Sequence, residues 1–323
     1  MSIPILWQDP FSIERRSLFI PIYFSSLDED EKLVIKECLK EFGINIEFSK
    51  PLFDYARFLK VLYIYRLRNK IREWMCLKFN TQNLLDYNSN IFPLITLLFK
   101  LFHESGAILH ELGIHNSEFL KFELDESLHS LKQNQLRKFI LNGNDDCLTE
   151  FYGIISALES QKDTLQEVTL EDCFFSTEFE VLNNFKNLET HRILDCDIEL
   201  LKILDHNIST LEISYCQINV LIIVQILEKV GKLLQRLKIE TGIVVREETL
   251  LLEALKSFCP NIIYLYITDI ELSTQLLEPI GNLQKLQFLS LWYAYHTPKK
   301  ERKYGLCNLL KYCRQHCNIL TSV

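Results

Sequence analysis

The sequence has few glycines and no long apolar run, and each shortage excludes a class of protein. Nine glycines occur in 323 residues, and none belongs to a GxGxxG or GxxxxGK[ST] string of the kind that cradles phosphate groups. The most apolar stretches, at 91–102 and 220–227, are shorter than the ~20 residues that span a bilayer. No secretory signal is visible at the N-terminus, so we expect a cytoplasmic or nuclear chain that spans no membrane.

The sequence also has fewer basic than acidic residues. The chain carries 43 acidic and 35 basic residues, for a formal net charge of −8. Because neutralising nucleic-acid phosphates needs a basic face, we expect no nucleic-acid partner. The catalytic strings GxSxG, HExxH and CxxC are missing, and the eight histidines stand at no fixed spacing from a nucleophile. We therefore expect no enzyme activity, no cofactor and no metal site.

A repeat dominates the C-terminal two thirds. The template L-x-x-L-x-L-x-x-C/N-x-L recurs from residue 136 onward, with a fainter unit at Leu109. Successive units begin 29, 23, 20, 26, 28 and 24 residues apart, within the ~20–29 residues typical of leucine-rich repeats. The units begin at Leu136, Leu165, Leu188, Ile208, Leu234, Ile262 and Leu286.

The template predicts the local structure of each unit. Alternate side chains of its x-L-x-L part enter the core from a short strand, and the C/N position turns the chain. The apolar stretch that follows is expected to form an outer helix, as at 219–234 and 246–258. No unit can bury its apolar face alone, so stacking supplies the core. We predict an α/β leucine-rich-repeat solenoid over 106–323, with a curved parallel sheet on the concave face and helices outside.

Residues 1–105 do not follow the template and are expected to form a mainly helical N-terminal cap. A helix is predicted to begin near Ser25 or Ser26, with acids in its first turn, and to end before Gly43. The segment 54–75 suits a strand or a helix, and 90–106 predicts a buried helix. A basic cluster in this region is interpreted as a solvated face rather than a binding site. It consists of Arg57, Lys60, Arg66, Arg68 and Arg72.

Cysteine and histidine positions have two interpretations each. Ten cysteines without a secretory signal indicate reduced thiols rather than a disulfide framework. Cys173, Cys196 and Cys216 share one template position, where a small side chain packs under the turn, and a metal or redox role is the alternative. His191 replaces a template leucine, either as a buried, hydrogen-bonded histidine or as a pH-sensitive weak point.

A further cysteine–histidine group lies near the C-terminus. Cys313, His316 and Cys317 match no recognised zinc spacing. They are interpreted as the end of a helix that leads into a strand, because 317–320 resembles 259–262.

The residues between the template leucines are expected to face outward on the sheet. Parallel register places Tyr264 beside Phe288 and Thr268 beside Trp292. Aromatic side chains next to basic ones have the composition of an interface hot spot. The alternative is that a C-terminal helix at 304–317, or a further repeat, covers these aromatics. The predicted partner-binding residues are Arg236, Lys238, Tyr264, Tyr266, Phe288 and Trp292.

The order of these segments resembles the F-box/leucine-rich-repeat families of some fungi. The resemblance covers the chain from Ile5 onward. It is carried by ILWQDPFS at 5–12 (Leu6, Trp7, Pro10 and Phe11), by the acidic helix, by PLFDYARFLKVLYIY at 51–65 and by the repeats with cysteine at the turn.

The resemblance implies that the repeats select a protein substrate for an SCF ubiquitin ligase, whose Skp adaptor and cullin are recruited through an F-box. The F-box would precede the ILW segment, so we expect it to be absent or truncated here. The last residues, ILTSV, are expected to begin the strand of a further repeat. The alternative is a standalone leucine-rich-repeat scaffold or regulatory binding protein unrelated to ubiquitin ligation.

Overall fold

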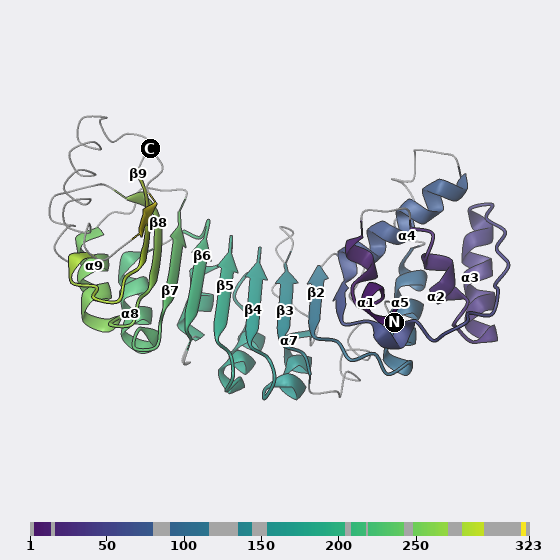
Figure 1. Cartoon of the computed structure of the whole chain (residues 1–323), viewed down its shortest axis with the longest axis horizontal. Helices are drawn as coiled ribbons and strands as arrows, with labels where there is room; N and C mark the ends of the chain where they lie inside the picture. Colours follow the sequence, from purple (N-terminus) through teal and green to yellow (C-terminus); the bar gives the residue numbers. More distant parts are fainter. Residues whose placement is uncertain are drawn as a thin grey trace. The chain divides into compact units, whose positions relative to one another are not determined.

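The structure is a computed structural model that describes residues 3–13, 17–79, 91–115, 135–143, 154–203, 208–217, 219–241, 248–270, 280–293 and 318–320. It divides into two compact units, Met1–Asn144 with Phe151–Leu165, and Asp145–Glu150 with Gln166–Val323. Parallel strands joined by helices make the fold an α/β leucine-rich-repeat solenoid, so the predicted fold class is confirmed (Figure 1). Among the described helices, none has the length and apolarity that crossing a membrane requires.

The helices of the first unit pack around aromatic side chains. Tyr23, Phe24 and Trp74 are fully buried, and Phe102 is 2% exposed. The helix predicted within 90–106 is confirmed, because α5 buries one apolar face. The helical segments are α1 (Ile3–Leu6), η1 (Pro10–Ser12), α2 (Ile20–Phe24), α3 (Glu29–Glu41), η2 (Ala56–Phe58), α4 (Ile64–Phe79), α5 (Phe92–Glu104), α7 (Ile154–Ala157) and η5 (Leu158–Gln161).

The start of α3 differs from the sequence-based prediction. Its N-cap is Asp28, whose side chain accepts a hydrogen bond from the Glu31 backbone in a capping box. The predicted caps, Ser25 and Ser26, instead donate to carbonyl oxygens in α2, because that helix ends directly before them. The predicted end is confirmed, since Gly43 follows α3 with a φ of +67°.

Three parallel strands complete the first unit. They are β1 (Val61–Tyr63), β2 (Glu111–His115) and β3 (Lys138–Asn142), and Leu62, Leu112 and Phe139 are aligned in their core row. β1 runs directly into α4, so the segment that suited either a strand or a helix contains both. The first unit therefore contains repeat-like strands as well as helices.

In the second unit, seven described strands lie in parallel and in register (Figure 1). Their inward side chains form rows across the strands that are apolar except at His191. One row, at most 1% exposed, consists of Leu170, Ile193, Ile213, Ile239, Ile267 and Leu291. The strands are β4 (Glu167–Glu171), β5 (Thr190–Leu194), β6 (Thr210–Ser214), β7 (Arg236–Glu240), β8 (Tyr264–Ile270), β9 (Phe288–Tyr293) and β10 (Asn318–Leu320).

The connections between strands vary with the length of the repeat. The units of 23 and 20 residues return through the 3₁₀ helices η6 (Thr177–Asn184) and η7 (Ile198–Ile203). The units of 26 and 28 residues return through the α-helices α8 (Val220–Val230) and α9 (Glu248–Phe258). A 3₁₀ helix rises ~2.0 Å per residue against ~1.5 Å in an α-helix, so a short unit spans the same path with fewer residues.

The three template cysteines lie under the turns, as predicted. Cys173, Cys196 and Cys216 are 1%, 7% and 4% exposed, and each thiol donates to the carbonyl oxygen two residues earlier, at 3.2, 3.1 and 3.4 Å. The residue before each cysteine has a positive φ, at 51°, 49° and 58°. Burial raises the pKa of the Cys216 thiol to about 11, which keeps it protonated at neutral pH. The part of the chain that the structure describes contains no group of three metal-ligating side chains.

His191 lies on the inward side of β5 with none of its surface exposed, opposite Val168 and Leu211 of the neighbouring strands. Its burial was expected. The group at 313–317 lies outside the described residues, except that the strand expected after it is present as β10.

Gly113 provides a test of packing in the first unit. A Cβ at this position would lie 2.2 Å from Cδ1 of Tyr63, whose buried ring lies over the glycine. We expect Gly113→Ala to lower the free energy of unfolding by ~1–3 kcal/mol, measured by urea denaturation. In a Tyr63→Ala background the same change should cost much less, and an equal cost in both backgrounds would contradict this packing.

Candidate functional site

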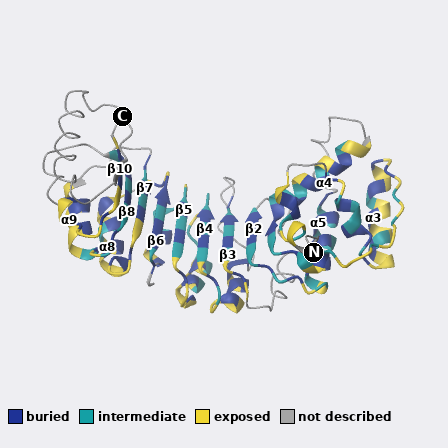
Figure 2. Ribbon diagram, viewed as in Figure 1, coloured by how far each residue is buried: buried dark blue, intermediate teal, exposed yellow. Residues whose placement is uncertain are grey.

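The candidate site is the sheet face of the second unit that the core does not use, here called the open face. Side chains alternate along each strand, so every second residue points away from the apolar rows. Figure 2 shows buried and half-buried residues along these strands. The outward residues of β4 to β9 are Glu167, Thr169, Glu171, Thr190, Arg192, Leu194, Thr210, Glu212, Ser214, Arg236, Lys238, Glu240, Tyr264, Tyr266, Thr268, Phe288, Ser290 and Trp292.

On strands β4 to β6 the open face is occupied by its own ion pairs. Arg192 lies between two carboxylates, forming an ion pair with Glu167 and a second one with Glu212, where its Nε is 3.0 Å from Oε2. Register places Arg192 and Glu212 directly opposite each other. Opposite charges on neighbouring strands stabilise the pairing of those strands, so the charge of Arg192 is engaged within the sheet.

On strands β7 to β9 the open face is aromatic. The guanidinium of Arg236 lies 4.5 Å from the ring centroid of Tyr264, whose ring centroid is 6.5 Å from that of Phe288. Lys238 lies 5.4 Å from the ring centroid of Tyr266. The side chains of Phe288 and Trp292 are 40% and 45% exposed. The structure thus brings together on one face all six predicted residues, here called the aromatic patch: Arg236, Lys238, Tyr264, Tyr266, Phe288 and Trp292.

Thr268 lies opposite Trp292 as predicted, but it shares that position with a second residue. Register holds between β8 and β9 as far as Ile267 and Leu291, then shifts so that Ile270 pairs with Tyr293. Thr268 and Asp269 therefore both lie opposite Trp292, which is the arrangement of a β-bulge. Thr268 is 8% exposed, and its hydroxyl accepts a hydrogen bond from the backbone N–H of Thr241 at 2.9 Å. It consequently contributes little surface beside Trp292.

Glu240 has three side-chain partners on or beside the open face. It pairs with Lys238 at 2.6 Å and accepts hydrogen bonds from the hydroxyls of Tyr215 at 3.1 Å and Ser214 at 3.4 Å. Tyr215 is 58% exposed and was missed at the sequence level, because the template marks its position only as a turn. Partial burial alone would raise the pKa of Glu240, but these three partners lower it below its ordinary value.

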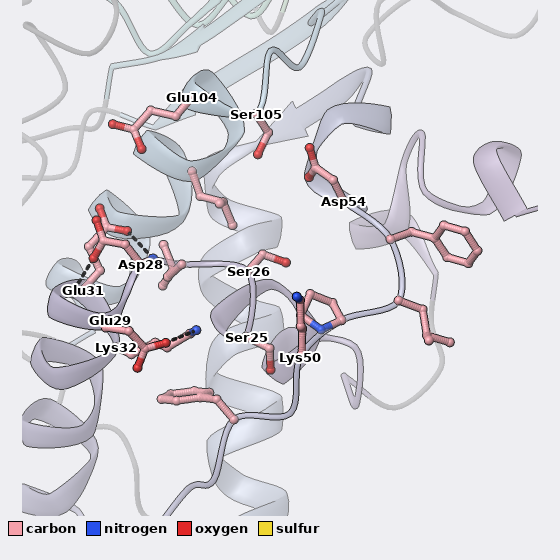
Figure 3. Close-up of a pocket in the computed structure, with 16 residues that line it drawn as sticks. Ser25, Ser26, Asp28, Glu29, Glu31, Lys32, Lys50, Asp54, Glu104 and Ser105 are labelled. Atoms are coloured by element: carbon pink, nitrogen blue, oxygen red, sulfur yellow. Dashed lines mark hydrogen bonds and ion pairs between the residues drawn. The ribbon is translucent and has the colours of Figure 1, made fainter.

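The first unit contains an open pocket of about 800 Å³. Figure 3 shows residues that line it, among them Glu104, Asp54, Ser26 and Lys50. Several of its charges are satisfied within the unit, since Glu29 pairs with Lys32 at 2.8 Å and Asp28 caps α3. No feature of the described residues selects a ligand for this pocket, and we assign it none.

The partners of Glu240 predict how stability depends on pH. Folding lowers the pKa of this carboxyl, so its contribution is present above the ordinary value of 4.5 and is lost as the pH falls through the lowered value. We expect Glu240→Gln to flatten the decline in unfolding free energy below about pH 5, measured by urea denaturation across pH. Tyr215→Phe, which removes one donor, should lie between the two, and parallel curves for all three would refute the assignment.

Comparisons with known proteins find similar structures of low sequence identity. No protein-family model and no curated protein matches the chain. Among solved structures, the chain is similar to an internalin from Listeria monocytogenes, with 16% identity over 73% of this chain and 57% of that one (TM-score 0.39). It is similar to a structure of the Rad7 and Elc1 complex from yeast, with 15% identity over 88% and 72% (TM-score 0.45). It is also similar to a leucine-rich-repeat protein from Leptospira interrogans, with 16% identity over 68% and 62% (TM-score 0.36). The chain thus spans less than two thirds of the internalin and of the Leptospira protein, and these similarities assign no activity.

Proposed function

We propose that the chain is a protein-binding module that holds its partner on the open face. The observation that supports this most directly is the exposure of the aromatic patch, where Phe288 and Trp292 project from regular strands with 40% and 45% of their surface exposed. Large aromatic side chains next to arginine are the residues that dominate binding energy at protein interfaces.

The geometry of the sheet favours this use of the face. The inward rows already bury the apolar side chains that hold the strands together, so the outward aromatics are not needed for the core. Stacking of Arg236 on Tyr264, and of Tyr264 near Phe288, holds these side chains in place before a partner binds. Pre-positioned side chains lose little conformational entropy on binding, which strengthens association.

We further propose that the bound protein is the substrate of an F-box-type SCF ubiquitin ligase. This part rests on the resemblance of the segment order to F-box/leucine-rich-repeat proteins, with Skp and cullin recruited through an F-box. A standalone scaffold or regulatory binding protein is the alternative, and capture of Skp and cullin by this chain would favour the ligase adaptor over it.

The experiment is affinity capture from native cell extract, read by mass spectrometry. The wild-type chain is compared with Phe288→Ala/Trp292→Ala and with Leu221→Ala/Leu233→Ala. The control removes two leucines that are 54% and 46% exposed in and after α8, away from the open face. Proteins that are lost only with the first variant are partners of the open face. Skp and cullin among the captured proteins would support the ligase adaptor and mean that docking survives without the expected F-box. Open-face partners captured without them would fit either a substrate-binding fragment of a ligase adaptor or the scaffold.

The contribution of Trp292 to the affinity for the partner can be measured with a single substitution. We expect Trp292→Ala to weaken binding of such a partner by ~2 kcal/mol or more, about 30-fold in Kd, because a half-exposed tryptophan becomes buried at an interface. The measurement is isothermal titration calorimetry with the purified partner. Unchanged affinity in a variant whose thermal unfolding matches the wild type would exclude the aromatic patch from the interface.

A further inference from the structure

The charges of the open face are not all satisfied within the sheet. Arg192 is paired with Glu167 and Glu212, and Lys238 is paired with Glu240. Arg236 is different, because no carboxylate of the described residues forms an ion pair with it, and its side chain is exposed. Glu171 also lacks an ion pair among the described residues, but it lies on β4, away from the aromatic strands. Arg236 is therefore the cation of the aromatic patch that is available to a partner.

The position of Arg236 suits one kind of acceptor. Its guanidinium uses one face on the ring of Tyr264, at 4.5 Å from the centroid. Stacking leaves the N–H donors at the edges of the guanidinium plane available, in the fork geometry that binds a carboxylate with two parallel hydrogen bonds. The residue directly opposite Arg236 on β6 is Thr210, which is neutral, so no carboxylate at that position competes for the N–H donors of Arg236.

The surrounding charges favour a carboxylate over a phosphate. Four outward glutamates, Glu167, Glu171, Glu212 and Glu240, outnumber the three cations of the open face. Glu212 lies opposite Lys238, two residues along the strands from Arg236, and Glu240 lies four residues along β7 from it. Both carboxylates repel a dianion more strongly than a monoanion. A single arginine in acidic surroundings therefore matches the single charge of an aspartate or glutamate side chain.

Register fixes the spacing between the cation and the exposed rings. Arg236, Tyr264 and Phe288 are aligned on three successive strands. Neighbouring strands are ~4.8 Å apart, so Arg236 and Phe288 are separated by ~10 Å. A polyproline II segment that crosses the strands rises ~3.1 Å per residue with three residues per turn, so side chains three positions apart lie ~9 Å apart on the same side.

We propose that the segment bound at the aromatic patch is an extended peptide stretch of the partner that carries one carboxylate side chain at this site. It places an aspartate or glutamate carboxylate on Arg236 and, three residues away, a large apolar side chain against Phe288, while a further residue of the segment contacts Trp292. This inference rests on the proposed function, because it names the chemistry of the partner at the same face.

The test is selection from a random peptide library displayed on phage, with the purified full chain as bait. The baits are the wild type, Arg236→Glu, Trp292→Ala and Lys186→Glu, the last of which makes the same charge change at an exposed residue before β5. We expect wild type and Lys186→Glu to select peptides with an acidic residue three positions from an aromatic or leucine. Arg236→Glu should instead select lysine or arginine at that position. For the best acidic peptide, glutamate-to-glutamine substitution should weaken binding to the wild type by about tenfold or more, and to Arg236→Glu hardly at all.

The outcomes separate this inference from the function on which it rests. Selected peptides that depend on Trp292 but show no acidic preference, or the same preference with Arg236→Glu, would refute the carboxylate and leave the open face as a protein-binding surface. Failure to select any peptide that depends on Trp292 or Arg236 would count against both proposals. Arg236→Gln is a second variant in case the charge reversal disturbs folding, and with it the acidic preference should be lost rather than reversed.

Discussion

Each parallel strand of the second unit depends on its neighbours to bury its inward side chains. Ile213, for example, lies between Ile193 and Ile239 in one row, and none of the three exceeds 1% exposure. Removing any strand would expose the rows on both sides of it, so the fold is stable only as a stack. After β4, β5 and β6, a residue with positive φ and a buried cysteine turn the chain in the same way, which keeps these strands aligned.

The apolar rows occupy the inward side of the sheet, so the outward side carries the charged and aromatic residues. The ion pairs of Arg192 lie on β4 to β6, and the aromatic patch lies on β7 to β9. Around Arg192 the two ion pairs stabilise strand pairing and engage the cation, so it offers a partner little. Around Tyr264 the stacked rings and Arg236 stay accessible. The β-bulge at Thr268 marks the end of regular register beside Trp292, where two residues of β8 lie opposite one of β9.

The sequence predicted the features that repeat and missed those that depend on one location. Template spacing located the strands, their register and the cysteines, because every unit must bury the same positions. It also brought together the six residues of the aromatic patch, since alternation along a strand leaves no other side for them. Three features escaped prediction: the cap of α3 at Asp28 instead of Ser25, the direct passage from β1 to α4, and the bulge at Thr268. Each depends on contacts with neighbouring segments, which the repeat template does not describe. The 3₁₀ connections follow from unit length, which was visible in the sequence but is a weaker signal than apolar spacing.

The alternation of side chains along each strand also has an evolutionary consequence. Substitutions at outward positions such as Arg236 or Ser290 leave the apolar rows untouched, so the surface can diversify while the scaffold persists. Duplication of a unit adds another outward strand at the same spacing, which lengthens the surface without redesigning what is already there. A protein built in this way can acquire a new binding preference through a few neighbouring substitutions, with folding and recognition under largely independent selection.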